Sequence, residues 1–161
     1  MKHIIKKQWT TGSGKSIDFY EILNLIKNYT VKGSKVFIGT DSFVSNKKIC
    51  FATAVCLHNK DNGGRYFFFR DHIPKKSHLH LISRITEEAR RSIEVGTLLM
   101  NEYKFDASLI ELHLDISPIS CGNATSKFSD MLKGYVQGYG FNYRIKPDAW
   151  ASQSIADKHS K

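Results

Sequence analysis

Hydrophobic positions in the first part of the chain follow two different periods. Within residues 16–27 the apolar side chains recur at helical spacing, and Ser16 is available as an N-cap. These apolar residues are Phe19, Ile22, Leu23 and Ile26. A β-rich run over residues 35–42 follows the turn signal of residues 32–34 and ends in polar side chains. The pattern predicts a short amphipathic helix and then a strand with a polar end.

Two further β-rich runs, residues 49–57 and 65–70, flank the polar segment of residues 59–64. The composition of that segment is typical of a hairpin loop. Together with the preceding strand, these runs predict an antiparallel meander of three strands. Residues 78–103 then show a long helical pattern with one main stripe. The stripe consists of Leu81, Ile85, Ser92, Val95 and Leu99.

The remainder of the chain alternates between strand and helix. Residues 109–115 have a two-residue period, which places Glu111, His113 and Asp115 on one face and apolar residues on the other. A helix is predicted over 124–136, a strand over 141–145 and a terminal helix over 148–158. We therefore expect an α/β fold with a mixed sheet of about five strands. Three would form the antiparallel meander and two would run parallel, with helices on both faces.

Composition narrows the class of protein. The 161 residues are 41% hydrophobic and 24% charged, as in one ordinary globular domain. No apolar stretch approaches the roughly 20 residues that span a bilayer, and the N-terminal residues lack the features of an export signal. Three cysteines without a CxxC pair favour reduced thiols. We expect a single cytoplasmic domain over residues 1–161, with residues 1–34 as an N-terminal helical extension, residues 35–161 as the core, and no membrane contact.

Charge indicates the kind of partner. Lys and Arg number 24 against 15 Asp and Glu, a net charge of +9, which favours a polyanion such as nucleic acid. Solubility alone is the alternative reason for a basic surface. The run Gly12-Ser13-Gly14-Lys15-Ser16 looks like part of a phosphate-binding loop, but Trp9 stands where that motif needs its first glycine. No apolar strand precedes the run, so we reject that interpretation.

Acidic residues follow two of the predicted strands. Asp41 and Asp115 each stand at or near a strand end, where open α/β sheets place their ligands. If the strands are neighbours the carboxylates converge, and such a pair repels unless a cation lies between its members. Oxygen ligands of this kind suit Mg²⁺ or Mn²⁺. The alternative is that each aspartate only caps a turn.

Two further acids are candidates. Glu88 interrupts the apolar stripe of the long helix, and a buried carboxylate needs a metal or an arginine. A salt bridge to Arg84 or Arg91, or exposure at the edge of the stripe, is the alternative. Asp148 begins a helix rich in small residues that can approach the sheet closely, although it can also serve only as an N-cap. Further acidic and imidazole groups follow near the C-terminus, with an exposed tail as the alternative.

Three ordered motifs carry a resemblance to a known family. They are Gly39-Thr40-Asp41-Ser42, His113-Leu114-Asp115-Ile116, and the run from Lys146-Pro147-Asp148-Ala149-Trp150-Ala151 through Ala156-Asp157-Lys158-His159. Together they span most of the chain and resemble the YkuK-type ribonuclease H-like family. The segment that begins at Asp148 is also similar to the last acidic motif of RuvC-type resolvases. The resemblance implies a ribonuclease H-like sheet whose acids bind metal, with Asp41, Glu88, Asp115 and Asp148 as catalytic and metal-binding residues.

These observations favour a metal-dependent nuclease that hydrolyses phosphodiester bonds by a two-metal mechanism with Mg²⁺ or Mn²⁺. Possible secondary groups are Ser42, His113, Asp157 and His159. Phosphate contacts are expected from Lys47, Lys48, Lys75, Lys76, Arg90, Arg91, Lys127 and Lys146. One alternative is a non-catalytic module with the same fold that binds nucleic acid or another partner. Another is a metal-dependent hydrolase of a small phosphate ester or nucleotide. RNA, DNA, hybrid and junction substrates all stay open, and nothing in the pattern marks an oligomer interface.

Overall fold

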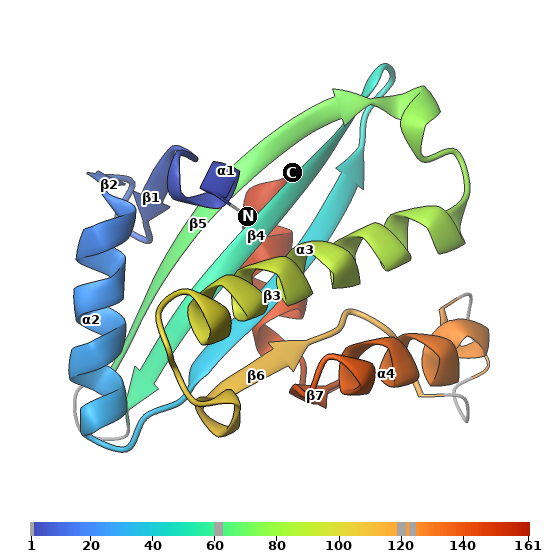
Figure 1. The fold of residues 1–161 in the computed structure, drawn as a ribbon. Helices are drawn as coiled ribbons and strands as arrows, with labels where there is room; N and C mark the ends of the chain where they lie inside the picture. Colours follow the sequence, from blue (N-terminus) through green and yellow to red (C-terminus); the bar gives the residue numbers. More distant parts are fainter. Residues whose placement is uncertain (1, 60–62, 119–121, 123–124) are drawn as a thin grey trace.

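The computed structural model describes residues 2–59, 63–118, 122 and 125–161, and its centre is a mixed sheet with helices on both faces (Figure 1). The strand order is β2-β1-β5-β4-β3-β6-β7. The expected mixed α/β architecture is confirmed, but the expected number of strands is wrong, because the sheet has seven strands rather than about five.

Five of the seven strands correspond to the predicted strands and follow their predicted order. Their bounds are β3 (Val36–Val44), β4 (Lys48–Asn59), β5 (Gly63–Pro74), β6 (Ile110–His113) and β7 (Asn142–Arg144). Strands β3, β4 and β5 form the antiparallel meander, while β6 pairs parallel to β3 and β7 parallel to β6. The predicted β4–β5 hairpin is present, although the middle of its loop, residues 60–62, lies outside the described residues.

The two additional strands come from the N-terminal segment, which was expected to be helical. After the short helix α1 (Lys2–Ile5), β1 (Trp9–Thr11) pairs with the edge of β5, and β2 (Ser16–Ile17) pairs with β1. Trp9 anchors this hairpin, because its ring is 1% exposed and its Nε1 donates a hydrogen bond to the Ile4 carbonyl at 3.0 Å. Strands of two or three residues show no readable period, which explains why the sequence pattern missed them.

Three helices cover one face of the sheet, which we call the core face. They are α2 (Phe19–Val31), α3 (Leu81–Asn101) and α4 (Ser129–Gly138), and their apolar stripes join one hydrophobic core with the strands. Helix α2 begins later than predicted because Asp18, rather than Ser16, is its N-cap and accepts a hydrogen bond from the Tyr20 backbone N–H at 2.7 Å. Short 3₁₀ turns precede or follow these elements: η1 (Lys75–Ser77), η2 (Ala107–Leu109) and η4 (Ser126–Phe128).

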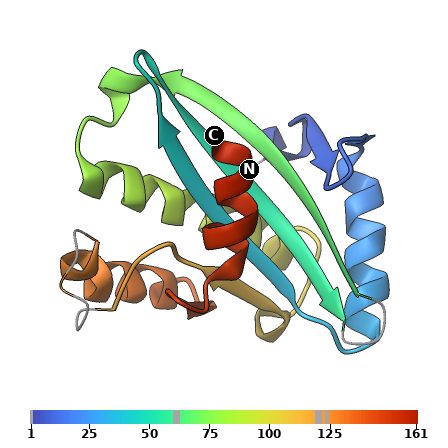
Figure 2. The ribbon, with the colours of Figure 1, turned by 180° about the vertical axis from the view of Figure 1, so that it is seen from behind.

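The opposite face carries the C-terminal helix, seen across the sheet in Figure 2. This helix consists of a π-helical segment, η5 (Ala151–Ala156), that continues into α5 (Asp157–Ser160). The predicted helix over 148–158 therefore begins later, because residues 146–148 form a turn in which the Asp148 N–H donates to the Ile145 carbonyl at 2.9 Å. We call this side the C-terminal-helix face. In the described part of the chain, no helix has the length and apolar character needed to cross a membrane.

Candidate functional site

A split between β3 and β6 creates the place where acidic residues meet. Strand β6 pairs with β3 only from Val36 to Gly39, whereas β3 continues to Val44. Beyond His113 the chain leaves β6, so the edge of β3 after Gly39 has no β6 partner. Asp41 and Asp115 therefore flank the opening, one from each strand. This is the position at which an open α/β sheet binds ligands.

Asp41 is a buried carboxylate beside other carboxylates. Its side chain lies on the C-terminal-helix face, only 7% of the residue is exposed, and Ser160 Oγ lies 2.9 Å from Oδ2 as a hydrogen-bond donor. Burial raises the pKa of Asp41 to about 7, the Ser160 hydrogen bond opposes that rise, and the nearby charges of Asp115 and Asp157 add to it. Close to neutral pH, the protonated and charged forms of Asp41 are therefore both populated.

Glu88 reaches the split from the core face. It lies on α3 and is 9% exposed, and Ser42 Oγ donates a hydrogen bond to its Oε1 at 2.5 Å. Burial raises the pKa of Glu88 well above its usual value, and the charge of Asp41 raises it further. Arg91, one expected partner, pairs instead with Asp71 and Glu87. The charge of Arg84 only partly offsets the rise in the Glu88 pKa.

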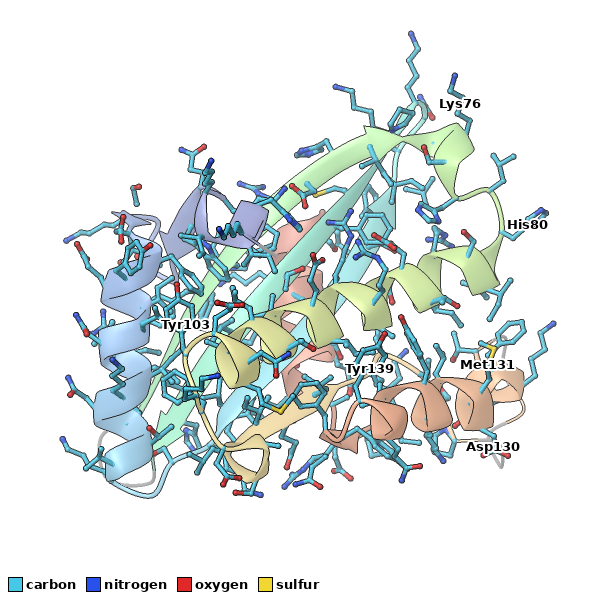
Figure 3. The ribbon with its side chains drawn as sticks, viewed as in Figure 1. Lys76, His80, Tyr103, Asp130, Met131 and Tyr139 are labelled. Carbon is cyan, nitrogen blue, oxygen red and sulfur yellow. The ribbon has the colours of Figure 1, made fainter. Side chains whose placement is uncertain are left out.

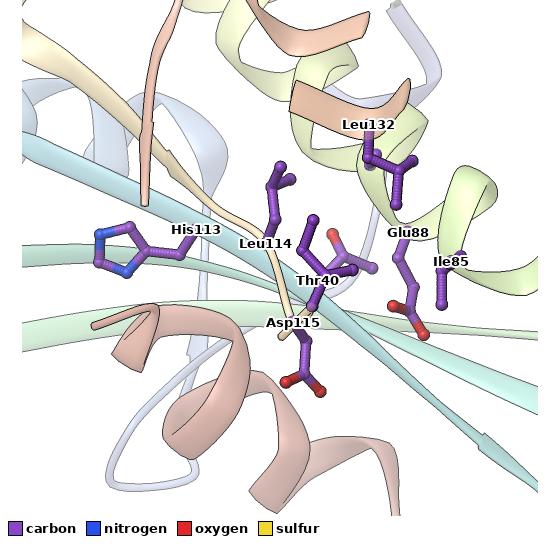
Figure 4. Close-up of a pocket in the computed structure, with 9 residues that line it drawn as sticks. Thr40, Ile85, Glu88, His113, Leu114, Asp115 and Leu132 are labelled. Carbon is purple, nitrogen blue, oxygen red and sulfur yellow. The ribbon is translucent and has the colours of Figure 1, made fainter. Parts of the chain in front are cut away.

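Asp115 is the acid that follows β6. Lys146 Nζ lies 2.9 Å from its Oδ1 in an ion pair, yet this buried oxygen has no hydrogen-bond partner within the described chain. A small cavity of about 10 Å³, the scale of one water position, is lined by Asp115, Glu88 and Thr40 among others. Figure 4 shows Glu88 descending from α3 toward β3 and the Asp115 carboxyl pointing toward the C-terminal helix.

The structure separates the two C-terminal aspartates. Asp148 is exposed in the turn before η5. Asp157 begins α5, is partly buried, and is close enough to raise the pKa of Asp41. Lys161 Nζ pairs with an Asp157 oxygen at 3.0 Å. Of the two, it is therefore Asp157 that joins the group around Asp41.

The position of the C-terminal helix depends on one glycine and one histidine. A Cβ on Gly39 would lie 2.4 Å from the Ser152 backbone nitrogen, so only glycine allows the helix to approach β3 this closely. The buried His113 accepts a hydrogen bond at Nδ1 from the Ala151 N–H, 3.0 Å away. Its Nε2 lies 3.0 Å from Glu111 Oε1, which fixes the tautomer with the proton on Nε2. His113 therefore positions the helix, and Glu111 in turn orients His113.

Of the remaining expected secondary groups, one contacts the acids and one does not. Ser42 contacts Glu88, as described above, whereas His159 points to the sheet, with its ring stacked on Phe68 at 3.6 Å and its Nε2 3.0 Å from the Tyr66 hydroxyl. Burial lowers the pKa of His159. Ser160 is a site residue that the sequence analysis missed. Its spacing of three residues from Asp157, one helical turn, is the signal that would have placed both on one helix face.

The expected phosphate-binding residues fall into two groups. Lys47, Lys48, Lys75 and Lys76 lie together at the far end of the sheet, where the Lys75 N–H donates to the Lys47 carbonyl, and Lys76 projects from that end (Figure 3). The others have local partners. Arg90 pairs with Glu87 and Glu94, Arg91 with Glu87 and Asp71, Lys127 lies over the Phe128 ring, and Lys146 pairs with Asp115.

The donor chemistry of the site fits a hard divalent cation. Its carboxylate oxygens are the ligands that Mg²⁺ and Mn²⁺ prefer. Lys146 pairs with Asp115, yet burial and the charges of Asp115 and Asp157 still raise the pKa of Asp41, which indicates negative charge that is not fully compensated. Within the described residues, however, no three His, Cys, Asp or Glu side chains already form a group able to hold a metal ion. Binding would therefore require the carboxylates to draw together.

Comparisons with known proteins bear on the whole of this arrangement. The family described as "Ribonuclease H-like" matches residues 19–161, which include strands β3 to β7 and all of the acids discussed above. No curated protein and no solved structure shows a significant match. Since the family match covers most of the chain, the protein belongs to the ribonuclease H-like family.

Proposed function

We propose that the protein is a metal-dependent nuclease that hydrolyses phosphodiester bonds of nucleic acid. The observation that carries this proposal is the Asp41 carboxylate, buried at the split in the sheet beside Asp115 with its pKa raised to about 7. A buried aspartate facing other acids destabilises the fold, and a divalent cation would remove that cost. Family membership supports nucleic acid as the substrate class.

Asp41 and Asp115 are the primary metal ligands in this proposal. Glu88 completes the set from α3, and Asp157 rather than Asp148 supplies the C-terminal carboxylate, because Asp157 acts on Asp41 while Asp148 is exposed. When bound, Mg²⁺ or Mn²⁺ would activate water and stabilise the leaving oxygen. Ser160 and Ser42 hold the Asp41 and Glu88 carboxyl groups in place through their hydrogen bonds.

The charge distribution supports a polyanionic substrate. The net charge is +9, and the cluster of Lys47, Lys48, Lys75 and Lys76 makes no ion pair with another described residue. These four lysines lie where β4 begins and β5 ends. Asp41 lies in the half of β3 that is nearer to this end of the sheet. They are therefore the first candidates for phosphate contacts, and binding through them would weaken with salt.

A binding module without turnover is the second candidate. The observation that favours it is that no three acidic or imidazole side chains among the described residues form a ready metal-binding group. A fold of this kind would bind nucleic acid through the same lysines without cutting it. Hydrolysis of a small phosphate ester or nucleotide would use the same acids and differs only in the size of its substrate.

The test is Mg²⁺- and Mn²⁺-dependent cleavage of labelled single-stranded RNA, duplex DNA, RNA–DNA hybrid and junction substrates, with mononucleotides as competitors. Asp41→Asn and Asp115→Asn should remove cleavage while leaving the fold and substrate binding intact. The pair Asp157→Asn and Asp148→Asn is matched, since the same change is made at two C-terminal positions. We expect the first to lose activity and the second to retain it.

Each outcome decides between the candidates. Cleavage by the wild type but not by the Asp41 and Asp115 variants establishes a metal nuclease and names its substrate. Cleavage suppressed by mononucleotides, with turnover of a small ester, indicates the smaller substrate. Salt-sensitive binding with no cleavage under any metal condition rejects the nuclease and leaves the binding module.

A further inference from the structure

The C-terminal helix covers only part of its face of the sheet (Figure 2). It packs against Ala54 and Cys56 of β4 and Phe68 of β5, and its last contact toward the lysine-rich end is the hydrogen bond from Ser160 to Asp41. Past that point the sheet of β3, β4 and β5 continues to the end that carries the β3–β4 hairpin. No described helix lies over this part of the sheet on this face (Figure 2). The sheet surface therefore continues directly from the acid site.

Strand register determines which side chains form this surface. One row across the sheet consists of Asp41, Ala52 and Arg70, and the next consists of Phe43, Cys50 and His72. Residues two apart on a strand share a face, so both rows lie on the C-terminal-helix face. In these two rows the central strand β4 contributes the small side chains of Ala52 and Cys50, while β3 and β5 contribute larger ones. Lys48 lies on the same face of β4, two residues before Cys50. We call Phe43, Lys48, Arg70 and His72 the distal platform.

Phe43 is the aromatic group of the distal platform. It is 44% exposed, whereas Phe37, the other phenylalanine of β3 on this face, packs against the Trp150 ring of the helix at 4.9 Å. Phe43 lies two residues from Asp41, about 7 Å along the same strand face. A single exposed phenylalanine is ordinary on a protein surface. The position of this one, next to the acids, is what connects it to the site.

The basic side chains of the distal platform have no ion-pair partner among the described residues. Arg70, Lys48 and His72 are exposed, and none of them forms an ion pair with another described residue. Arg70 Cζ lies 5.8 Å from the centre of the Phe68 ring, a cation–π contact that keeps the positive charge of Arg70. On the core face the adjacent Asp71 is fully engaged with Lys7 and Arg91. The distal platform is therefore positively charged right beside the acid site.

We propose that the distal platform binds single-stranded nucleic acid and leads it into the acid site, with a base stacked on Phe43 and phosphates on Arg70 and Lys48. This inference rests on the proposed function, because it names the substrate of the same site. Aromatic groups set among cations are the pattern by which proteins hold unpaired strands. A duplex keeps its base faces stacked inside, so it cannot use Phe43 in this way.

The test measures binding rather than cleavage. Fluorescence anisotropy in EDTA would follow labelled single-stranded DNA and RNA 12-mers and a duplex of equal length over a range of salt concentrations. Phe43→Leu keeps an apolar side chain but removes the aromatic face, whereas Phe43→Trp keeps that face. The matched controls are Tyr139→Leu, at the exposed aromatic residue that caps the C-terminus of α4, and Arg65→Ala, at the other end of β5.

We expect the single strands to bind more tightly than the duplex. Phe43→Leu should weaken single-strand binding by roughly 5- to 100-fold, and Phe43→Trp should restore it. Arg70→Ala should weaken binding and lower the salt dependence by about 0.7 in the log–log slope, while both controls should bind as the wild type does. Equal binding by the wild type, Phe43→Leu and Arg70→Ala would overturn the inference, as would a preference for duplex.

Failure of this inference differs from failure of the proposed nuclease. Cleavage that depends on Asp41 while binding ignores Phe43 leaves the nuclease intact and removes the distal platform. Single-strand binding that depends on Phe43, without cleavage under any metal condition, keeps the distal platform and removes the nuclease.

Discussion

Two groups on this fold each contain an aspartate and a glutamate, but the pKa values of their carboxyls shift in opposite directions. In the first, Asp71 and Glu87 are surrounded by arginine and lysine side chains, which hold the pKa of both carboxyls below its usual value against the effect of burial. In the second, burial raises the pKa of Asp41 and Glu88, and neighbouring acids raise it further. We call the first the paired cluster and the second the acid cluster.

Glu87 of the paired cluster and Glu88 of the acid cluster are consecutive residues on α3, so only the directions of their side chains separate them. Glu87 accepts hydrogen bonds from Arg90 and Arg91, whereas Glu88 turns to the split and accepts one from Ser42. The paired cluster is complete within the protein and serves its structure. Among the described residues, neither Asp41 nor Glu88 forms an ion pair, and this difference supports their place in the proposed site.

The largest expected effect is on the pH dependence of stability. The pKa of Asp41 is raised in the folded state from 3.8 to about 7, so between these values the folded protein binds more protons than the unfolded one. The free energy of unfolding without metal should therefore fall as pH rises from about 4 to about 7, by at most about 4 kcal/mol. The raised pKa of Glu88 acts in the same direction.

Urea unfolding in EDTA between pH 4.5 and 8 would measure this effect. Asp41→Asn should flatten the pH dependence and be more stable than the wild type at pH 8, while Asp148→Asn serves as the exposed control. The paired cluster gives the opposite sign, because its lowered pKa values contribute stability that is lost only as pH falls below about 4. Identical pH profiles for the wild type and Asp41→Asn would contradict the assignment.

The second effect separates neighbouring glutamates by activity. Glu88→Gln should lower metal-dependent cleavage by about 100-fold or more, because even the partners of metal ligands cost 10- to 100-fold when they are lost. Glu87→Gln should leave the cleavage rate nearly unchanged and reduce stability instead. Cleavage rates and urea unfolding of both variants would check this. Equal loss of activity in the two variants would contradict the assignment of Glu88, rather than Glu87, to the metal site.

The third effect is a break in the paired cluster. Arg91 side-chain atoms are 12% exposed, bind Asp71 at 2.6 Å and Glu87 at 2.8 Å, and lie over the Phe51 ring. Arg91→Ala should destabilise the protein by about 2–3 kcal/mol, since it leaves two partly buried carboxylates short of a partner. Arg91→Lys, which keeps the charge but loses the planar contacts, should be intermediate in thermal unfolding. A loss below about 0.5 kcal/mol would place the cluster among ordinary surface pairs.

The smallest effect is expected at the rim of the paired cluster. Arg90 is 46% exposed and pairs with Glu87 and Glu94 along the surface of α3. Exposed pairs of this kind contribute at most about 0.5 kcal/mol, so Arg90→Ala should scarcely change urea unfolding. The same variant tests whether Arg90 contacts phosphate. If the ion pairs with Glu87 and Glu94 keep Arg90 from binding phosphate, Arg90→Ala should also leave nucleic-acid binding unchanged.

Much of the acid cluster could be predicted from local sequence. Asp115 follows one β-rich run and Asp41 lies near the end of another, although β3 continues to Val44. These positions are visible in the hydrophobic pattern without any knowledge of the neighbours. Glu88 is visible as an acid on the buried side of a helical stripe. These predictions depend on periodicity alone, which acts over a few residues and needs no tertiary information.

The C-terminal acid could not be predicted in this way. Asp148 and Asp157 both lie in the last part of the chain, and the choice between them depends on where the helix begins and how it crosses the sheet. That placement follows from the close approach at Gly39 and from the hydrogen bond between His113 and Ala151. Both contacts join distant segments, so no local period records them. The β1–β2 hairpin escaped notice because its strands are too short to show a period.

The hydrogen bond between Ser160 and Asp41 joins residues 119 positions apart in the sequence. Contacts of such separation form late, because a long loop must close before they can contribute. During synthesis the meander can pair as soon as it emerges, whereas the contact with Ser160 is impossible until residue 160 has left the ribosome. The nascent chain therefore carries Asp41 without the C-terminal helix until residue 160 has emerged, and the hydrogen bond from Ser160 can form only after the meander has been synthesised.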